Sequence, residues 1–307
     1  MTISKRDRYR GAMLGVLCGD ALGAPYETWD SIAISEDMRE RGGLTTFDYT
    51  EPWKGKRKIR MGSPTDDSDH TVALAQSLVA CKGLSEADLY ARLRTIVYDG
   101  VSPITGEKTY GAGLTTKTAL KPETWEESKA RPFEDEYPSN GSLMRSAPLA
   151  LFIGTEARAK TLDSFKLATT MSRVTHRHKY AGIYTAVYVE ILLDILNGVV
   201  PNVHVDTDGN TPPCDPRKWP ERGHVEFSYH IALWAFSRSS NYRDGLTKAI
   251  SVGGDTDTYG AIAGGLLGAH FGIDGIPKEW REVLQGGDIM IDLADKLFDL
   301  AHAPFPL

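Results

Sequence analysis

The sequence predicts an all-α protein, and three observations support this prediction. Several long segments place apolar residues at helical spacing. Two sets of glycines recur at every fourth position, which is a helical period and not the period of a strand. No alternating β-branched segments are joined by an Asn-Gly or Asp-Gly turn, so little sheet is expected. We expect one domain over residues 1–307.

The predicted helices follow one another along the chain. Ser85 is a suitable N-cap for a helix over residues 86–99, in which Leu89, Leu93 and Ile96 form one stripe. The apolar segment 180–197 ends at Asn-Gly, a typical helix end. The same spacing predicts helices over residues 225–236, 242–252 and 289–300.

Two segments are expected to be long surface loops, residues 50–64 and residues 201–223. The first contains a short basic run, residues 54–60, which we interpret as solvated surface. In the second, residues 206–210 resemble the start of a calcium loop. Because Arg217 stands where a bidentate acid is required, we interpret them as a solvated turn.

The glycine sets are Gly11, Gly15, Gly19 and Gly23, and Gly260, Gly264, Gly268 and Gly272. In a helix, each set lies on nearly one face. Glycine costs about 0.5–1 kcal/mol relative to alanine inside a helix, so both sets need a compensating interaction. We infer two helices that pack at close backbone distance in the core and tie the N-terminal third to the C-terminal third.

Composition is ordinary for a soluble globular protein, with 41% hydrophobic and 25% charged residues. A net charge of -6 argues against a nucleic-acid partner. Cys18, Cys81 and Cys214 form no CxxC pair, which fits a reduced intracellular protein. No apolar run reaches the roughly 20 residues of a membrane span, and Asp20 interrupts the first one, which argues against a secretory signal. We expect a cytoplasmic protein with no membrane partner.

Two acidic motifs, Thr65-Asp66-Asp67 and Asp255-Thr256-Asp257-Thr258, precede apolar helices far apart in the sequence. Each alone is explained by helix capping. Two such motifs favour a shared site for a hard cation such as Mg2+ or Mn2+, which selects oxygen ligands. The second also resembles the DxDxT motif of haloacid-dehalogenase phosphatases, but its fifth position is Tyr259 and glycines precede it.

Five ordered motifs between residues 11 and 272 resemble the ADP-ribosylglycohydrolase family. They are the first glycine helix through Gly19-Asp20-Ala21-Leu22-Gly23-Ala24-Pro25-Tyr26-Glu27, then Thr65-Asp66-Asp67, Ser139-Asn140-Gly141-Ser142-Leu143-Met144-Arg145, Thr175-His176 and Gly253-Gly254-Asp255-Thr256-Asp257-Thr258. The resemblance implies an orthogonal helical bundle with two divalent cations, Mg2+ or Mn2+, in a central cleft. The implied metal ligands are Thr65, Asp66, Asp67, Asp255, Asp257 and Thr258.

The resemblance also implies a binding site for ADP-ribose. The implied contacts are Asn140, Gly141, Ser142, Met144, His176, Tyr110 and Gly111. Arg145 either pairs with phosphate or forms a structural ion pair. His176 either contacts the diphosphate or is a satisfied helix-end histidine, and His178 and Lys179 are spare donors. The resemblance also implies, for Asp99, a position near the one where some members place an acid proposed to assist ribose opening.

The implied reaction is metal-dependent hydrolysis that releases ADP-ribose by cleavage at the anomeric carbon. Asp66, Glu27 and Asp257 are the candidate catalytic residues, with Asp66 or Glu27 taking a proton from water, although Glu27 could equally be a solvated loop acid. Arginine-linked ADP-ribose is the expected substrate, because Asp67-Ser68-Asp69 resembles the bacterial, reactivating branch of the family. The alternatives are serine-linked, nucleotide or small-molecule conjugates, a crystallin-like binding or structural role, and a metal phosphohydrolase.

Overall fold

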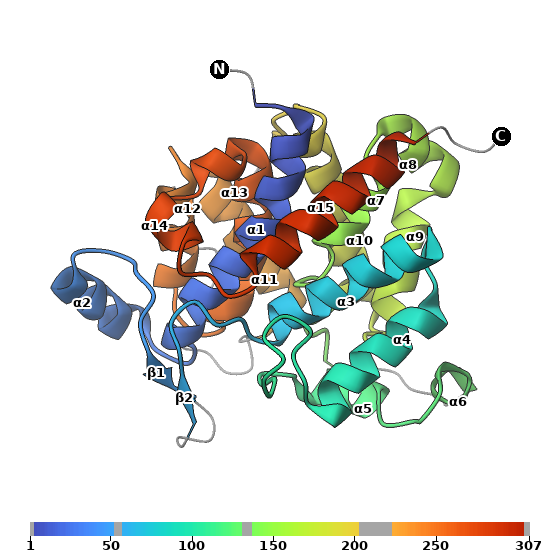
Figure 1. Ribbon diagram of the computed structural model, residues 1–307, viewed down its shortest axis with the longest axis horizontal. Coiled ribbons are helices and arrows are strands. Elements are labelled where there is room, and N and C mark those ends of the chain that lie inside the picture. Colours follow the sequence, from blue (N-terminus) through green and yellow to red (C-terminus); the bar gives the residue numbers. More distant parts are fainter. Residues whose placement is uncertain (1–2, 52–56, 131–136, 203–222, 304–307) are drawn as a thin grey trace.

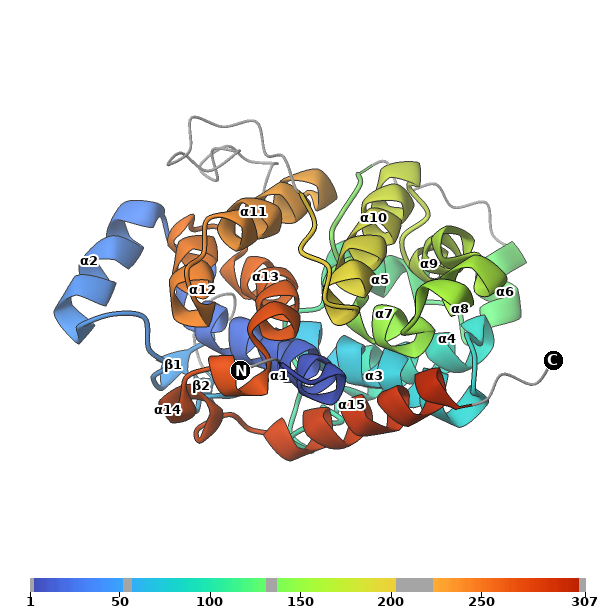
Figure 2. The same ribbon diagram turned by 90° about the horizontal axis from the view of Figure 1, so that it is seen from above.

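A computed structural model describes residues 3–51, 57–130, 137–202 and 223–303 of the chain, and these residues are mostly helical (Figures 1 and 2). Most of the predicted loop 201–223 lies outside the described residues. So do residues 206–210, Arg217, Cys214 and part of the basic run 54–60. No helix among the described ranges is both long enough and apolar enough to cross a membrane.

The first half of the described chain contains α1 (Lys5–Gly23), the 3-10 turn η1 (Ala24–Tyr26), α2 (Ser31–Arg41), β1 (Tyr49–Thr50), β2 (Lys58–Ile59), α3 (Asp66–Cys81), α4 (Glu86–Arg94), the π-helical turn η2 (Thr95–Asp99), α5 (Leu114–Ala119) and α6 (Trp125–Ala130). The second half contains α7 (Ala147–Ile153), α8 (Glu156–Leu162), α9 (Ser164–Arg173), α10 (Lys179–Leu196), α11 (Val225–Ser237), α12 (Tyr242–Ser251), α13 (Thr256–Phe271), the 3-10 turn η3 (Ile273–Gly275), α14 (Lys278–Arg281) and α15 (Gly287–His302).

Four of the predicted helices are confirmed as α10, α11, α12 and α15, with ends that differ by only a few residues. The predicted helix 86–99 is confirmed over its whole length, although its last turn differs in type: α4 stops at Arg94 and the chain continues to Asp99 as the π-helical turn η2. Apolar spacing cannot reveal this change, since both helix types bury similar stripes. The prediction of a loop over residues 50–64 is wrong in part, because Thr50 pairs with Lys58 in an antiparallel hairpin.

The two glycine sets form the predicted contact between α1 and α13, which pack side by side (Figures 1 and 2). A Cβ added at Gly15 would lie 2.1 Å from the carbonyl oxygen of Gly264, and one at Gly19 would lie 1.9 Å from that of Gly260. Only glycine allows backbones to approach so closely. Gly272 departs from the prediction, since α13 ends at Phe271 and Gly272 follows the helix with φ 72°.

The contact between α1 and α13, which we call the glycine seam, is antiparallel. Gly11 therefore faces Gly268 at one end, and Gly23 faces Thr256 at the other. The Thr256 hydroxyl donates to the Gly23 carbonyl oxygen at 2.9 Å. The seam thus brings the C-terminal end of α1 to the N-terminal end of α13, where the second acidic motif begins.

Candidate active site

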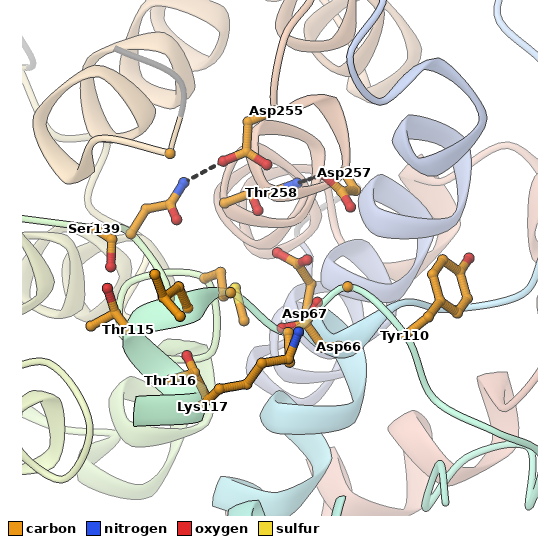
Figure 3. Close-up of a pocket in the computed structure, with 18 of the residues that line it drawn as sticks. Asp66, Asp67, Tyr110, Thr115, Thr116, Lys117, Ser139, Asp255, Asp257 and Thr258 are labelled. Carbon is orange, nitrogen blue, oxygen red and sulfur yellow. Dashed lines mark hydrogen bonds between the residues drawn. The ribbon is translucent and has the colours of Figure 1, made fainter. Parts of the chain in front are cut away.

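A cavity of about 920 Å3 opens where the end of α1, the start of α3 and the start of α13 meet. Figure 3 shows Asp66 and Asp67 at the start of α3 facing the start of α13. Most residues predicted from the sequence line this cavity: Glu27, Asp66, Asp67, Tyr110, Gly111, Asn140, Gly141, Met144, His176, Asp255, Asp257 and Thr258. We call Glu27, Asp66, Asp67, Asp255 and Asp257 the acidic cluster.

Glu27, Asp255 and Asp257 each offer a carboxylate oxygen within 4.8 Å of the other two. A glycine turn brings them together: Gly253 and Gly254 have φ 80° and 90°, which favours glycine. The amide of Gly254 donates to the Trp29 carbonyl oxygen at 2.9 Å, and Thr28 donates to the Gly254 carbonyl oxygen at 2.7 Å. Glu27 is only 9% exposed, so its interpretation as a solvated loop acid is wrong.

Asp66 and Asp67 begin α3, and Thr65 is the N-cap. Asp67 Oδ2 accepts from the Thr65 hydroxyl at 3.0 Å, whereas its buried Oδ1 has no hydrogen-bond partner among the described residues. Gly111 has φ 106°, and a Cβ there would lie 2.2 Å from Asp66 Oδ1. The loop therefore presses its backbone against Asp66, which only glycine permits.

Asp20 is a site residue that the sequence reasoning did not identify. It is fully buried in α1 and accepts hydrogen bonds from the amides of Thr65 and Ser68, both at 3.0 Å, and from the Ser68 hydroxyl. These bonds anchor the start of α3 to the glycine seam. The sequence signal for this role is an acid within an apolar glycine-rich helix.

The electrostatics of the acidic cluster call for a compensating positive charge. Burial, followed by repulsion from neighbouring carboxylates, raises the pKa values of Asp66, Asp67 and Asp257 well above their ordinary value. Burial also raises the pKa of Asp20 to about 6. Converging oxygen donors, one of them a buried carboxylate oxygen without a partner, are the donor set that hard divalent cations prefer. The residues present therefore fit a divalent cation.

Ser139, Asn140, Gly141 and Met144 of the loop at residues 139–145 form another part of the cavity wall. Asn140 Nδ2 donates to Asp255 Oδ2 at 2.7 Å and to the Ser228 hydroxyl at 2.8 Å, so this side chain ties Asp255 to α11. A Cβ at Gly141 would lie 2.8 Å from Cε1 of His176. Burial lowers the pKa of His176 well below its ordinary value, so the ring is neutral beside the cavity.

Several predicted residues do not line the cavity. Ser142 is fully buried and is hydrogen-bonded to the hydroxyls of Thr185 and Ser172. Thr65 does not line the cavity either, but its hydroxyl donates to Asp67, which does. Arg145 is fully buried at the end of the loop, where it donates to the Gly141 carbonyl oxygen and the Thr175 hydroxyl, and it has no acidic partner among the described residues. Asp99, His178 and Lys179 are also outside the lining.

The cavity lining also contains residues that were not predicted individually from the sequence. They are Glu51, Arg57, Lys108, Thr115, Thr116, Lys117 and Tyr137. Arg57 belongs to the basic run 54–60, whose interpretation as solvated surface is wrong at this residue because Arg57 lines the cavity. Arg57, Lys108 and Lys117 add positive charge to the lining of a cavity that also contains the acidic cluster.

Known proteins resemble this chain over nearly its whole length. A profile of the ADP-ribosylglycohydrolase family matches residues 1–306. The chain is similar to an ADP-ribosyl-(dinitrogen reductase) glycohydrolase of Rhodospirillum rubrum, with 25% identity over 95% of this chain and 98% of that protein. It is also similar to ADP-ribosylarginine hydrolase Tri1 of Pseudomonas putida, with 27% identity over 96% and 79%, and to ADP-ribosylhydrolase ARH3 of Homo sapiens, with 25% identity over 94% and 92%.

Fold comparison gives the same result. A solved structure described as an ADP-ribosylglycohydrolase-related protein complex matches with a TM-score of 0.72 and 29% identity, over 97% of this chain and 99% of that one. The family match spans nearly the whole sequence, as the five ordered motifs predicted. The chain therefore belongs to the ADP-ribosylglycohydrolase family.

Proposed function

We propose that this protein is a hydrolase that requires a divalent cation and releases ADP-ribose by cleaving the bond at the ribose anomeric carbon. The observation that carries the proposal is the acidic cluster, whose carboxylates come from three segments and converge at a cavity. A crystallin-like structural role would not require buried acids with a raised pKa, because they cost stability without a cation.

Each part of the cavity has a proposed role. Asp66, Asp67, Asp255, Asp257 and Thr258 would hold one or two Mg2+ or Mn2+ ions, assisted by Thr65. When bound, the ions supply positive charge that orients the ribose hydroxyls and activates water. The carboxylate of Glu27 or Asp66 takes the proton of the attacking water. His176 and the backbone of Gly141 face the diphosphate, and Met144, Tyr110 and Gly111 border the substrate.

Arginine-linked ADP-ribose is the proposed substrate. A relative named as an ADP-ribosylarginine hydrolase supports this proposal, and it matches this chain over 96% of its length. The cationic residues Lys108 and Lys117 of the cavity lining are suited to the anionic diphosphate of the same substrate.

We expect the protein to release free ADP-ribose from an ADP-ribosylarginine peptide with Mg2+ or Mn2+, and not with EDTA, because the acidic cluster cannot act without its cation. Chromatography of the released ADP-ribose measures this. Release from an ADP-ribosylserine peptide alone would contradict the proposed linkage. Released inorganic phosphate would instead indicate a phosphohydrolase, and no reaction on any conjugate despite bound metal would contradict hydrolysis altogether.

Stabilisation by metal should depend on pH. In the metal-free protein the pKa values of Asp66, Asp67 and Asp257 are raised, so above about pH 4 the folded state binds more protons than the unfolded state. The free energy of unfolding therefore falls as pH rises through the raised pKa values. Metal binding displaces those protons and offsets this loss. We expect Mg2+ to raise the melting temperature more at about pH 7.5 than at about pH 5, as measured by thermal denaturation against EDTA; an equal shift would contradict this.

A further inference from the structure

Glu51 is an acid of the cavity wall to which none of the roles above has been assigned. It follows β1, is 8% exposed and lines the cavity. Within the parts of the chain that the structure describes, its carboxylate has no hydrogen bond or ion pair. A carboxylate removed from water usually has a partner, because burial of an unpaired charge is costly. Glu51 therefore presents to the cavity a carboxylate that has no partner among the described residues.

The hairpin directs Glu51 toward the reaction site. Side chains two residues apart on a strand share a face, so Glu51 extends the face of Tyr49. The Tyr49 hydroxyl is hydrogen-bonded to the hydroxyl of Tyr110, which lines the cavity. Burial, and then the charges of Asp20, Asp257 and Glu27, raise the pKa of Tyr49, so this face lies near the acidic cluster.

The natural partner of Glu51 is engaged elsewhere. Arg57 lies across the hairpin, and the Glu51 amide donates to its carbonyl oxygen at 3.0 Å. The Arg57 guanidinium, however, donates to the Lys108 carbonyl oxygen, lies 3.8 Å from Glu107 Oε2, and stands 5.5 Å from the ring centre of Tyr110. These contacts occupy the guanidinium while leaving the carboxylate of Glu51 open to the cavity.

We propose that Glu51 binds the guanidinium of the arginine that carries ADP-ribose, and so determines specificity for arginine-linked conjugates. This inference rests on the proposed function and adds a residue to it. A carboxylate can accept two parallel hydrogen bonds from a guanidinium, and the charge on both partners strengthens them. A neutral serine linkage gains nothing from this acid. Glu51 is therefore a specificity residue, separate from the acids that would hold metal.

The test compares Glu51→Gln with Glu282→Gln, which removes one negative charge at a side chain that is 62% exposed. Peptides of one sequence carry ADP-ribose on arginine or on serine. We expect Glu51→Gln to lower kcat/KM for the arginine conjugate about ten- to hundredfold, chiefly through KM, because a hydrogen bond to a charged group is lost. Activity on the serine conjugate, Mg2+ affinity and the melting temperature should not fall. Glu282→Gln should match the wild type, and Glu51→Asp should keep part of the preference.

Calorimetric binding separates this proposal from the proposed function. The probe is an ADP-ribosylarginine analogue with a carbocyclic ribose, which cannot be hydrolysed, and free ADP-ribose is its reference. Weaker binding of the analogue alone to Glu51→Gln supports the role of Glu51, even if the wild type hydrolyses no conjugate and the proposed function fails. Equal binding of the analogue to wild type and Glu51→Gln, or an equal loss for free ADP-ribose, would overturn the role of Glu51 while leaving hydrolysis intact.

Discussion

Replacement of Asp257 by asparagine should abolish turnover and metal binding while leaving a folded protein. Asp257 is 3% exposed and belongs to the acidic cluster, so its replacement changes the site and leaves the protein surface as it is. Its Oδ1 accepts from the Thr258 amide at 2.9 Å, and asparagine can retain that bond. We expect kcat/KM to fall about a thousandfold or more, because a metal centre supplies several kcal/mol to the transition state.

The same substitution should make the metal-free protein more stable. The pKa of Asp257 is raised by burial and by the charges of Glu27, Asp67 and Asp255, so a neutral amide removes an unfavourable charge at neutral pH. Thermal denaturation with EDTA should show a higher melting temperature than that of the wild type, and Mg2+ should add little. Asp274→Asn, at a side chain that is 92% exposed, should behave like the wild type. An Asp257→Asn variant that binds Mg2+ normally and remains active would refute the metal site.

The sequence predicted those features of the fold and site that repeat or stand in motifs. Helical spacing indicated α10 through its 18 residues, and glycine spacing indicated the seam, because both are regular patterns. The acidic motifs indicated the cluster because adjacent carboxylates need a reason to be together. The helices, the glycine seam and the acidic cluster can each be inferred without knowing which loops cover the site.

The features that were not predicted depend on tertiary position. Asp20 becomes an anchor only because α3 starts beside it, and Glu51 becomes a cavity residue only because a two-residue strand pair turns it inward. Ser142 shows the reverse case, since it lies in a motif and yet points into a buried hydroxyl network. A motif thus located the loop, while packing decided which of its side chains reach the cavity.

Substitution of Gly19 by alanine should cause the largest loss of stability of any single methyl group added to the protein. The new Cβ would lie 1.9 Å from the Gly260 carbonyl oxygen and 2.2 Å from its carbonyl carbon. Neither contact can be relieved by a side-chain rotation, because both atoms belong to the backbone of α13. The two helices would have to separate in the core, and we expect a loss of about 3–5 kcal/mol in the free energy of unfolding, as measured by urea denaturation.

The Gly19→Ala substitution should also weaken the metal site, because the glycine seam positions both the end of α1 and the start of α13. Asp20 lies on α1 beside Gly19 and anchors α3, so a displaced α1 would separate the two acidic motifs that share the cation. Folded Gly19→Ala protein should therefore bind Mg2+ more weakly than the wild type. Gly83→Ala is the matched control, since the nearest atom to its added Cβ is 3.9 Å away. Unchanged stability in Gly19→Ala would mean that the backbones are not in contact, and the explanation for eight glycines at helical spacing would fail.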